Sequence, residues 1–374
     1  MRKYFGTDGV RGVANKELTC DLAYRLGRAG GYVLAQGDHR VKVVVGKDTR
    51  MSGDMLESAL IAGLMSVGCD IIPVGVIPTP AVAYLTRKYN ADCGVVISAS
   101  HNPMEDNGIK FFNKDGFKLD DAIELEIEKY IENIDKVDCN PVGENVGVIN
   151  HEHNALRDYV DYLKSIINVD LTGMKVVLDC ANGASYEVAP TVFKELGANV
   201  IDINTTPNGK NINDKCGSTH PEMLQKAVVE NKADLGLAYD GDADRLIAVD
   251  ENGNIVDGDH IMILSAVYLK KKNQLSNNTL VITVMTNIGL NVAAREHGIN
   301  LETTDVGDRY VIEAMKKGEF NLGGEQSGHM IFSDYNTTGD GVLSSLMLSK
   351  IIMEEKKPLS ELASIMSVYP QVLV

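Results

Sequence analysis

Short apolar runs alternate with longer helical patterns along most of the 374-residue chain, which predicts an α/β fold with largely parallel strands. The first part of the chain predicts three strands and two helices in alternation: strands 41–48, 69–75 and 93–98, and helices 51–68 and 79–89. Ser52 is the expected N-cap of the first helix and Gly68 its stop. A further helix over 120–134 and a polar linker to about residue 154 complete this part.

One strand–turn–helix–strand theme occurs three times, over residues 43–74, 175–203 and 280–304. We therefore predict three similarly built α/β domains with mixed, mostly parallel sheets around a central cleft. The predicted domains follow one another along the chain: 1–154, 155–253 and 254–368. Residues 369–374 are expected to begin a fourth, C-terminal domain that this sequence lacks.

Charge and composition narrow the classes of partner. The chain has 36 basic and 52 acidic residues, a formal charge of −16, which argues against a nucleic-acid partner. The sequence has no apolar run of 18 residues and no apolar segment of the secretory kind at its start, so we predict neither a membrane span nor a signal peptide. Six scattered cysteines without a C-x-x-C pair favour reduced thiols and a cytoplasmic location.

The stretch "DGDADR" (240–245) lies between two apolar runs. In extended backbone, alternate side chains point the same way, so the carboxylates of Asp240, Asp242 and Asp244 are expected to converge. Convergence is costly unless a cation lies among them, and oxygen ligands suit Mg²⁺. An EF-hand loop is set aside because Arg245 stands where that loop needs glycine. A solvated acidic turn is the structural alternative.

The stretch "VVISASHNP" (95–103) passes from an apolar strand into two hydroxyls, an imidazole and a proline. Without a G-x-S-x-G elbow, a hydrolase triad is disfavoured, and His101 need not be the base for its neighbour. A phosphorylated serine, neutralised by a divalent cation, would join this stretch to the acidic one. The residues do not decide between Ser98 and Ser100, although Ser100 lies further from the apolar run. A polar turn closed by Pro103 is the alternative.

The stretch "GGEQSGH" (323–329) has the residue types of a sugar site. Its glycines, among them Gly324, allow the backbone to approach a ligand closely. Glu325, Ser327 and His329 supply donors and acceptors for hydroxyls or an amine. A hairpin-like turn is the plainer interpretation.

Two cations are candidates for phosphate binding. Arg11 lies in the glycine-marked stretch "FGTDGVRG" (5–12) and could clamp a phosphate. Lys110 follows the serine stretch and could bind phosphate or act as a general base. Taken alone, each residue is more typical of a surface charge than of a catalyst.

The four motifs, in this order, resemble the α-D-phosphohexomutase superfamily from residue 4 to residue 370. "FGTDGVRG", "SASHNP", "DGDADR" and "GEQSGH" are similar to its N-terminal, phosphoserine, metal and sugar-specificity loops. The last motif and "VGDRYV" (306–311) look most like the branch that acts on glucosamine phosphates. The chain departs from that pattern at Asp305, where a lysine is frequent, and no R-x-S-G-T-E-P phosphate loop occurs.

The resemblance implies that Ser100 carries an activating phosphoryl group. It also implies one Mg²⁺ per chain, held by the three aspartates and by the phosphate of Ser100. The implied active site further contains residues that bind substrate or do acid–base work: Glu325, Ser327, His329 and Gly324 for the sugar, Arg11 and Arg245 beside the reacting groups, and Lys110, His101 and His329 as acid–base candidates.

The implied reaction interconverts glucosamine 6-phosphate and glucosamine 1-phosphate through a bisphosphorylated sugar, towards UDP-N-acetylglucosamine and cell-wall sugars. The partner is then a small amino-sugar phosphate, with no nucleic acid and no membrane. A homodimer is compatible with the sequence, which does not determine the oligomeric state. The alternatives are a phosphoglucomutase or phosphomannomutase, a metal-dependent phosphatase, and a non-catalytic sugar-phosphate binding protein.

Overall fold

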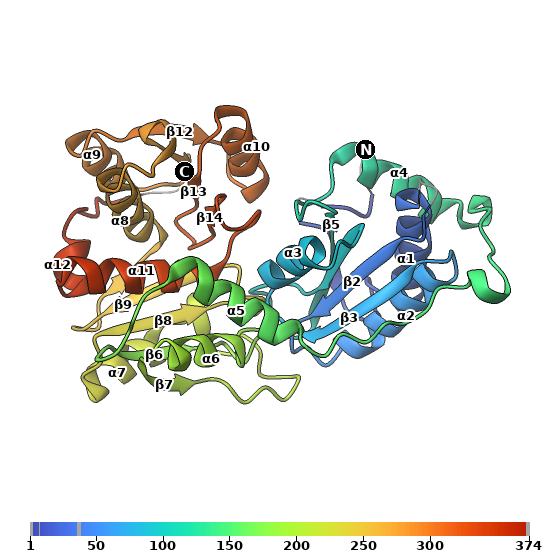
Figure 1. Ribbon diagram of the computed structural model, residues 1–374, viewed down its shortest axis with the longest axis horizontal. Coiled ribbons are helices and arrows are strands. Elements are labelled where there is room, and N and C mark those ends of the chain that lie inside the picture. The colour runs from blue at the N-terminus through green and yellow to red at the C-terminus, as the bar shows by residue number, and fades with distance from the viewer. Residues whose placement is uncertain (1–2, 7, 36–38, 372–374) are drawn as a thin grey trace. The chain divides into compact units, whose positions relative to one another are not determined.

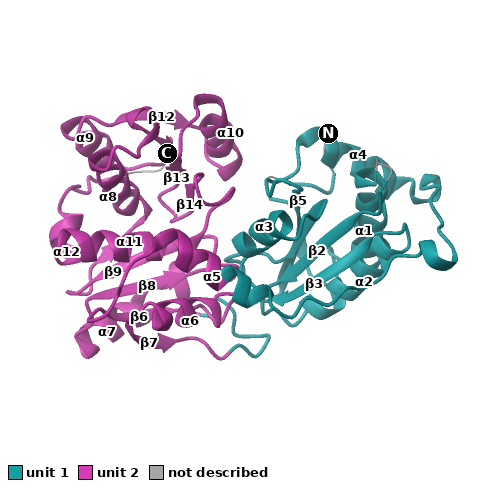
Figure 2. Ribbon diagram, in the orientation of Figure 1, with its two compact units in different colours: residues 1–159, 207–214 teal, residues 160–206, 215–374 magenta. Residues whose placement is uncertain are grey.

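Three sheets in this chain share one strand topology. The computed structural model describes residues 3–6, 8–35 and 39–371 (Figure 1). Thr7 of the N-terminal motif and residues 372–374 of the expected start of a further domain lie outside the described residues. The chain divides into two compact units, which are described separately (Figure 2): unit 1 comprises 1–159 and 207–214, and unit 2 comprises 160–206 and 215–374.

Unit 1 contains sheet I, with the strand order β1-β5-β4-β2-β3. Its strands are β1 (Val10–Val13), β2 (Lys42–Lys47), β3 (Asp70–Val76), β4 (Cys93–Ile97) and β5 (Asp106–Asn113). β2 pairs in parallel with β3 and β4, and β5 runs antiparallel to β4 and β1. The β-branched residues of β2 and β4 are buried on both faces, as the centre of a covered sheet requires.

Helices cover both faces of sheet I. The helices of this unit are α1 (Cys20–Leu34), α2 (Gly53–Met65), α3 (Thr79–Lys88) and α4 (Asp121–Glu132). α1, α2 and α4 share one apolar core with the sheet, and α3 packs on the other side of β2 (Figure 1). α1 and α2 can approach closely because Gly27 has no side chain. A Cβ at this residue would lie 2.2 Å from the carbonyl oxygen of Leu60.

Sheet II in unit 2 has the strand order β10-β9-β8-β6-β7. Its strands are β6 (Lys175–Asp179), β7 (Asn199–Ile203), β8 (Leu235–Tyr239), β9 (Leu246–Asp250) and β10 (Ile255–Val256). β6 pairs in parallel with β7 and β8, and β9 runs antiparallel to β8. The helices of this region are α5 (Ala155–Ile167), within which the division between the units falls, α6 (Val188–Glu195) and α7 (Glu222–Asn231).

Sheet III, also in unit 2, has the strand order β12-β11-β13-β14. Its strands are β11 (Thr279–Thr283), β12 (Asn300–Thr304), β13 (Leu322–Gly324) and β14 (Met330–Phe332). β11 pairs in parallel with β12 and β13, and β14 runs antiparallel to β13. The helices of this region are α8 (Gly258–Lys271), α9 (Ile288–Glu296), α10 (Asp308–Gly318), α11 (Gly341–Glu355) and α12 (Leu359–Ala363).

The three sheets are copies of one design. In each, strand, helix, strand, helix and strand are followed by an antiparallel strand, and the first strand lies between the second and the third. This confirms the prediction of three similarly built α/β domains with mixed sheets. The expected boundaries at residues 154 and 253 and the expected central cleft stay predictions, because each unit is described by itself.

Two local predictions differ from the structure in detail. Ser52 precedes α2 as expected, but its hydroxyl makes no capping bond and instead accepts a hydrogen bond from the Asn107 amide at 2.9 Å. α2 ends at Met65, before Gly68, whose φ of +90° turns the chain into β3. The polar stretch after α4 is not a simple linker, because part of it pairs with β3. The Ile71 N–H of β3 donates to the Val148 carbonyl, and the Asn150 N–H donates to the Ile71 carbonyl.

None of the helices in the described residues combines the length and the apolar character needed to cross a bilayer.

Candidate functional site

The same hairpin carries the candidate chemistry in all three sheets. It joins the third strand to the antiparallel fourth strand, at the carboxyl end of the parallel pair, where ligands of open α/β sheets bind. These connections are β4–β5 with Ser100, β8–β9 with the three aspartates, and β13–β14 with Glu325 and Ser327. In unit 2 the last two adjoin, because Arg245 and His329 form a β-bridge and the Leu246 N–H donates to the Gly328 carbonyl at 3.0 Å.

Asp240, Asp242 and Asp244 converge as the spacing predicted. One carboxylate oxygen from each lies within 4.8 Å of the others, and all three residues are buried. The loop closes tightly because Ala243 adopts a φ of +58° and its N–H donates to the Asp240 carbonyl at 3.0 Å. Three buried carboxylates repel one another unless a cation neutralises them, and an all-oxygen set suits a hard divalent ion. The trio can therefore hold a metal ion.

The loop after β6 packs against the metal loop. The Ala184 N–H donates to the Gly241 carbonyl at 2.8 Å, and a Cβ on Gly183 would lie 2.4 Å from that oxygen. At the base of this loop, Asp179 accepts hydrogen bonds from the backbone N–H groups of Ala181 and Gly217. Burial nevertheless raises the pKa of Asp179. The absence of a side chain at Gly183 therefore allows the loop after β6 to contact the metal loop at Gly241.

Arg245 and His329 lie against the aspartates. Burial would lower the pKa of Arg245, but the carboxylates of Asp244, Asp240 and Asp242 raise it overall. His329 is buried, with Nδ1 3.5 Å from a carboxylate oxygen of Asp244. Its Nε2 accepts the Gly339 N–H at 3.2 Å and lies 3.8 Å from a carboxylate oxygen of Asp308, so the ring stands between two carboxylates. The ring can help to orient Asp244, and the expected acid–base role of His329 stays a prediction.

The sugar-type hairpin is anchored to a second motif. The Glu325 carboxylate accepts the Gly307 N–H at 3.0 Å, which ties "GEQSGH" to "VGDRYV". The Gly328 N–H closes the turn onto the Glu325 carbonyl at 3.0 Å. Ser327 is exposed at the tip, and a Cβ on Gly324 would lie 2.4 Å from the His329 carbonyl oxygen. Glu325 and Ser327 are therefore placed on one turn, and Gly324 permits the pairing that forms it.

In unit 1 the hydrogen bonds separate the two candidate serines. The Ser98 hydroxyl donates to Asp48 at 2.6 Å and accepts the Ser100 N–H at 2.9 Å, so it is committed to the loop itself. Ser100 adopts a φ of +52°, and its Oγ lies 3.4 Å from Nδ1 of His101. The two hydroxyls therefore differ in their partners, and the choice of Ser100 as the reactive one stays a prediction.

Asp8 gathers the basic residues of unit 1. Its carboxylate lies 3.0 Å from the Lys110 ammonium and also pairs with Arg11 and Lys118. Burial would raise the pKa of Asp8, but Lys110, Lys118 and Arg11 outweigh it and hold the pKa well below its usual range. Arg11 and Lys110 thus lie with Lys118 around one carboxylate, and side chains of these types commonly bind phosphate. Sequence reasoning missed Asp8 and Lys118, although Asp8 lies within the quoted N-terminal motif.

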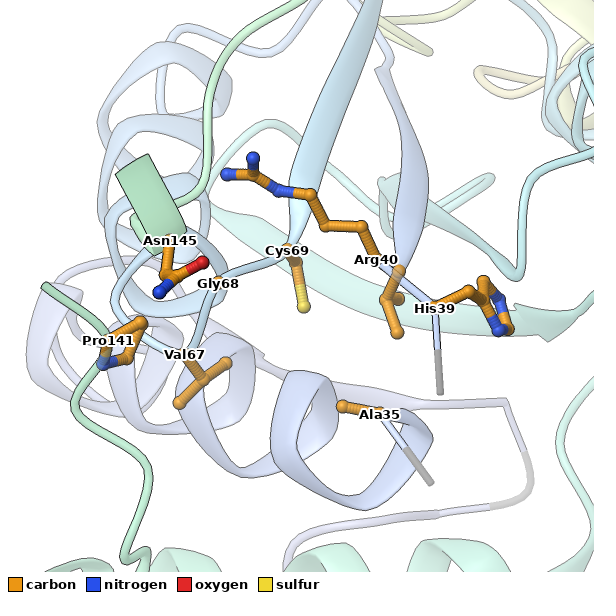
Figure 3. A pocket seen from close by; sticks show the side chains of 9 residues that line it. Ala35, His39, Arg40, Val67, Gly68, Cys69, Pro141 and Asn145 are labelled. Atoms are coloured by element: carbon orange, nitrogen blue, oxygen red, sulfur yellow. The ribbon is translucent and has the colours of Figure 1, made fainter. Parts of the chain in front are cut away.

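A hollow elsewhere in unit 1 has a different character (Figure 3). It encloses about 370 Å³ and includes Arg40 and Cys69 in its wall. Arg40 donates to the carbonyls of Glu144 and Val146 and pairs with Asp70 at 3.2 Å. Its guanidinium therefore fastens the segment after α4 to β3, and the hollow is a product of that packing.

Ser100 with its cationic neighbours belongs to unit 1, whereas the aspartates, Arg245, Glu325, Ser327 and His329 belong to unit 2. That these two groups of residues form one site stays a prediction.

The chain matches three domain descriptions of one family. These are phosphoglucomutase/phosphomannomutase alpha/beta/alpha domain I over residues 2–138, domain II over 157–253 and domain III over 257–369. The phosphoglucosamine mutase of Clostridioides difficile (strain 630) is 79% identical over 374 residues, which cover 100% of this chain and 84% of that protein. The phosphoglucosamine mutase of Thermoanaerobacter sp. (strain X514) is 62% identical over 375 residues, with 100% and 83% covered.

Solved structures agree with these matches. A phosphoglucomutase/phosphomannomutase family protein from Burkholderia thailandensis superposes with a TM-score of 0.84 at 28% identity, covering 100% of this chain and 81% of the other. The fold also matches an N-acetylphosphoglucosamine mutase of Aspergillus fumigatus, with a TM-score of 0.66 at 16% identity and with 98% and 80% of the chains covered. On its three domains and its identity to curated relatives, the chain belongs to the phosphoglucomutase/phosphomannomutase family within the α-D-phosphohexomutase superfamily, among the relatives of the phosphoglucosamine mutases.

Proposed function

We propose that this mutase interconverts glucosamine 6-phosphate and glucosamine 1-phosphate through a phosphoryl group carried on Ser100. The observation that supports it best is the repetition of one hairpin in three sheets, bearing in turn a serine, three buried aspartates and a sugar-type turn. The relatives at 79% and 62% identity are named for the same reaction, which favours an amino sugar over glucose or mannose phosphates.

The metal is proposed to be Mg²⁺, held by Asp240, Asp242 and Asp244. The fit rests on the donor set, since three buried carboxylate oxygens within 4.8 Å of one another suit a small, hard cation. The phosphoryl group on Ser100 would add a further oxygen ligand. When bound, the ion would neutralise charge that develops on the transferring phosphoryl group.

Ser100 exchanges the phosphoryl group with the substrate in two steps. In the first, the bond between the phosphorus and Ser100 Oγ breaks as O1 of glucosamine 6-phosphate bonds to phosphorus. The O1 hydroxyl gives up its proton and Ser100 Oγ takes one up, through the acid–base candidates Lys110, His101 and His329, and the second step moves a proton from Ser100 Oγ to O6 in the same way. The resulting 1,6-bisphosphate reorients, and its 6-phosphoryl group returns to Ser100 Oγ, which leaves glucosamine 1-phosphate. Such transfers need in-line positioning and charge neutralisation more than covalent help.

The remaining residues divide into charge carriers and sugar ligands. Arg11, Lys110 and Lys118 all pair with the carboxylate of Asp8, and this group of cations is proposed to bind a phosphate of the substrate. Glu325 and Ser327 lie on one turn and are proposed to hold sugar hydroxyls.

The decisive experiment compares wild type with Ser100→Ala and with Ser58→Ala, an exposed serine of α2, as the control. Intact-mass spectrometry should find an addition of about 80 Da, one phosphoryl group, mapped to Ser100 in wild type and in the control. ³¹P NMR should show that wild type and Ser58→Ala convert glucosamine 6-phosphate. Ser100→Ala should not convert it. Circular dichroism checks that the variant is folded.

Two results would contradict the proposal. Undiminished conversion by Ser100→Ala excludes the covalent role. Release of inorganic phosphate without phosphoserine instead identifies a metal-dependent phosphatase. A further test replaces Mg²⁺ with paramagnetic Mn²⁺. If the aspartates and Ser100 act on one phosphoryl group, Mn²⁺ should broaden the ³¹P signal of phospho-Ser100. An unchanged signal would contradict the proposal that the phosphoryl group is a ligand of the metal.

A further inference from the structure

Two side-chain nitrogens hold the same two carbonyl groups of the Ser100 loop. Nη2 of Arg50 donates to the backbone oxygens of Ser100 and Asn102, at 2.9 Å each. Nδ2 of Asn213 donates to the same two oxygens, at 2.9 and 3.0 Å. Each nitrogen has two hydrogens and each carbonyl two lone pairs, so the four bonds form a closed ring.

Arg50 is itself fixed in place by Asp48. Nε of Arg50 donates to Asp48 at 2.9 Å, and both side chains are fully buried. Asp48 also accepts the Ser98 hydroxyl, which in turn accepts the Ser100 N–H. The backbone of Ser100 is therefore held at its N–H and at its carbonyl by one connected network.

Ser100 needs such support because its φ of +52° is left-handed. Residues with a Cβ adopt this conformation only at a cost, and it persists where the surroundings over-determine it. The conformation sets the direction in which the Ser100 side chain leaves the loop. A loop released from the network would relax towards other φ values and move the hydroxyl.

Asn213 reaches the loop from a distant part of the chain. It lies in residues 207–214, which group with unit 1 although the chain on both sides belongs to unit 2. The same segment is attached to unit 1 a second time, where the Gly209 carbonyl accepts the Met51 N–H at 3.0 Å. Asn213 is buried and has a φ of +57°, so the segment is folded to present this amide.

We propose that Asn213 and Arg50 are positioning residues for phosphoryl transfer at Ser100, an inference that rests on the function proposed above. They act through the backbone carbonyls of the loop. The charge of Arg50 is compensated by Asp48, so its contribution is the geometry of its fork rather than neutralisation of phosphate.

The test uses two substitutions that remove the geometry differently. Asn213→Asp keeps the shape but loses both donors and turns a carboxylate towards two carbonyl oxygens. Arg50→Lys keeps the positive charge but replaces the fork by one nitrogen, which cannot hold Asp48 and both carbonyls in the present geometry. Each should lower kcat on the order of 10²-fold, the cost of misplacing a reacting group by about 1 Å, with KM nearly unchanged. Asp214→Asn, at an exposed neighbour in the same segment, should leave both constants as in wild type.

Turnover is normalised to the amount of phosphorylated Ser100, measured by intact mass, so that a loss of folded protein does not imitate the effect. If Asn213→Asp does not fold, Asn213→Ala is measured in its place. The proposal is overturned if the normalised kcat of the variants equals that of wild type, or if KM rises while kcat stays the same. In either case an inactive Ser100→Ala leaves the proposed function intact, whereas an active Ser100→Ala refutes that function separately.

Discussion

Asp259 makes the stability of unit 2 depend on pH. It lies in the first turn of α8, is fully buried, and accepts the Asn287 N–H at 2.8 Å. Burial, with a smaller contribution from the charge of Asp257, raises the pKa of Asp259 from 3.8 to about 6. Asp259→Asn removes the ionisation and keeps an oxygen that can accept the same N–H.

A folded-state pKa above the unfolded-state value means that the folded state holds its proton longer. The stability is fully present below pH 3.8 and is lost as the pH rises through about 6. With these two values, ionisation lowers the free energy of unfolding by about 1.6 kcal/mol at pH 5 and by about 3 kcal/mol at pH 8. The difference between wild type and Asp259→Asn should therefore grow by about 1.4 kcal/mol from pH 5 to pH 8, in favour of the variant.

Urea denaturation of both proteins at pH 5 and pH 8 measures this difference, because every other titrating group cancels in the comparison. The new amide can cost about 1–3 kcal/mol if its N–H groups lack partners, but that cost is the same at both pH values. Asp305→Asn, at an exposed residue of the same unit, serves as the control and should show no growth. A difference between wild type and Asp259→Asn that is equal at both pH values would refute the reasoning.

Two further predictions concern the metal loop. Gly183→Ala places a Cβ 2.4 Å from the Gly241 carbonyl oxygen, so the metal loop must shift. We expect the free energy of unfolding to fall by about 1–3 kcal/mol and Mg²⁺ to bind more weakly. A wild-type Mg²⁺ affinity measured by calorimetry would contradict this prediction. His329→Ala removes the ring beside Asp244, so Mg²⁺ affinity should fall roughly 10–100-fold by titration calorimetry while Ser100 remains phosphorylatable. Unchanged Mg²⁺ affinity would contradict a role of His329 in orienting Asp244.

Local pattern predicted much of the fold because strand and helix periods are properties of short segments. The three recurrences at 43–74, 175–203 and 280–304 correspond to the first strand, helix and second strand of each sheet. The convergence of the aspartates was predictable for the same reason, since alternate residues of an extended stretch share a side. The pattern did not predict that Ser52 would lack a capping bond, because its hydroxyl is engaged by Asn107 from a neighbouring strand.

Other features depend on contacts between residues far apart in sequence. The engagement of the Ser98 hydroxyl depends on Asp48, which lies at the end of another strand. The sequence could have indicated a role for Arg50, because it is a charged residue that follows the carboxyl end of a predicted parallel strand. Asn213 carries none, because it lies 113 positions from Ser100.

The amino-acid sequence by itself determined the repeated α/β design, the aspartate trio and the types of residue at each candidate loop, because these follow from spacing over a few residues. Only the tertiary structure decided which hydroxyl Asp48 engages, which carboxylate gathers the cations and which amide holds the serine loop. Those features arise where the path of the chain brings distant segments within hydrogen-bonding distance, and no local periodicity encodes that path.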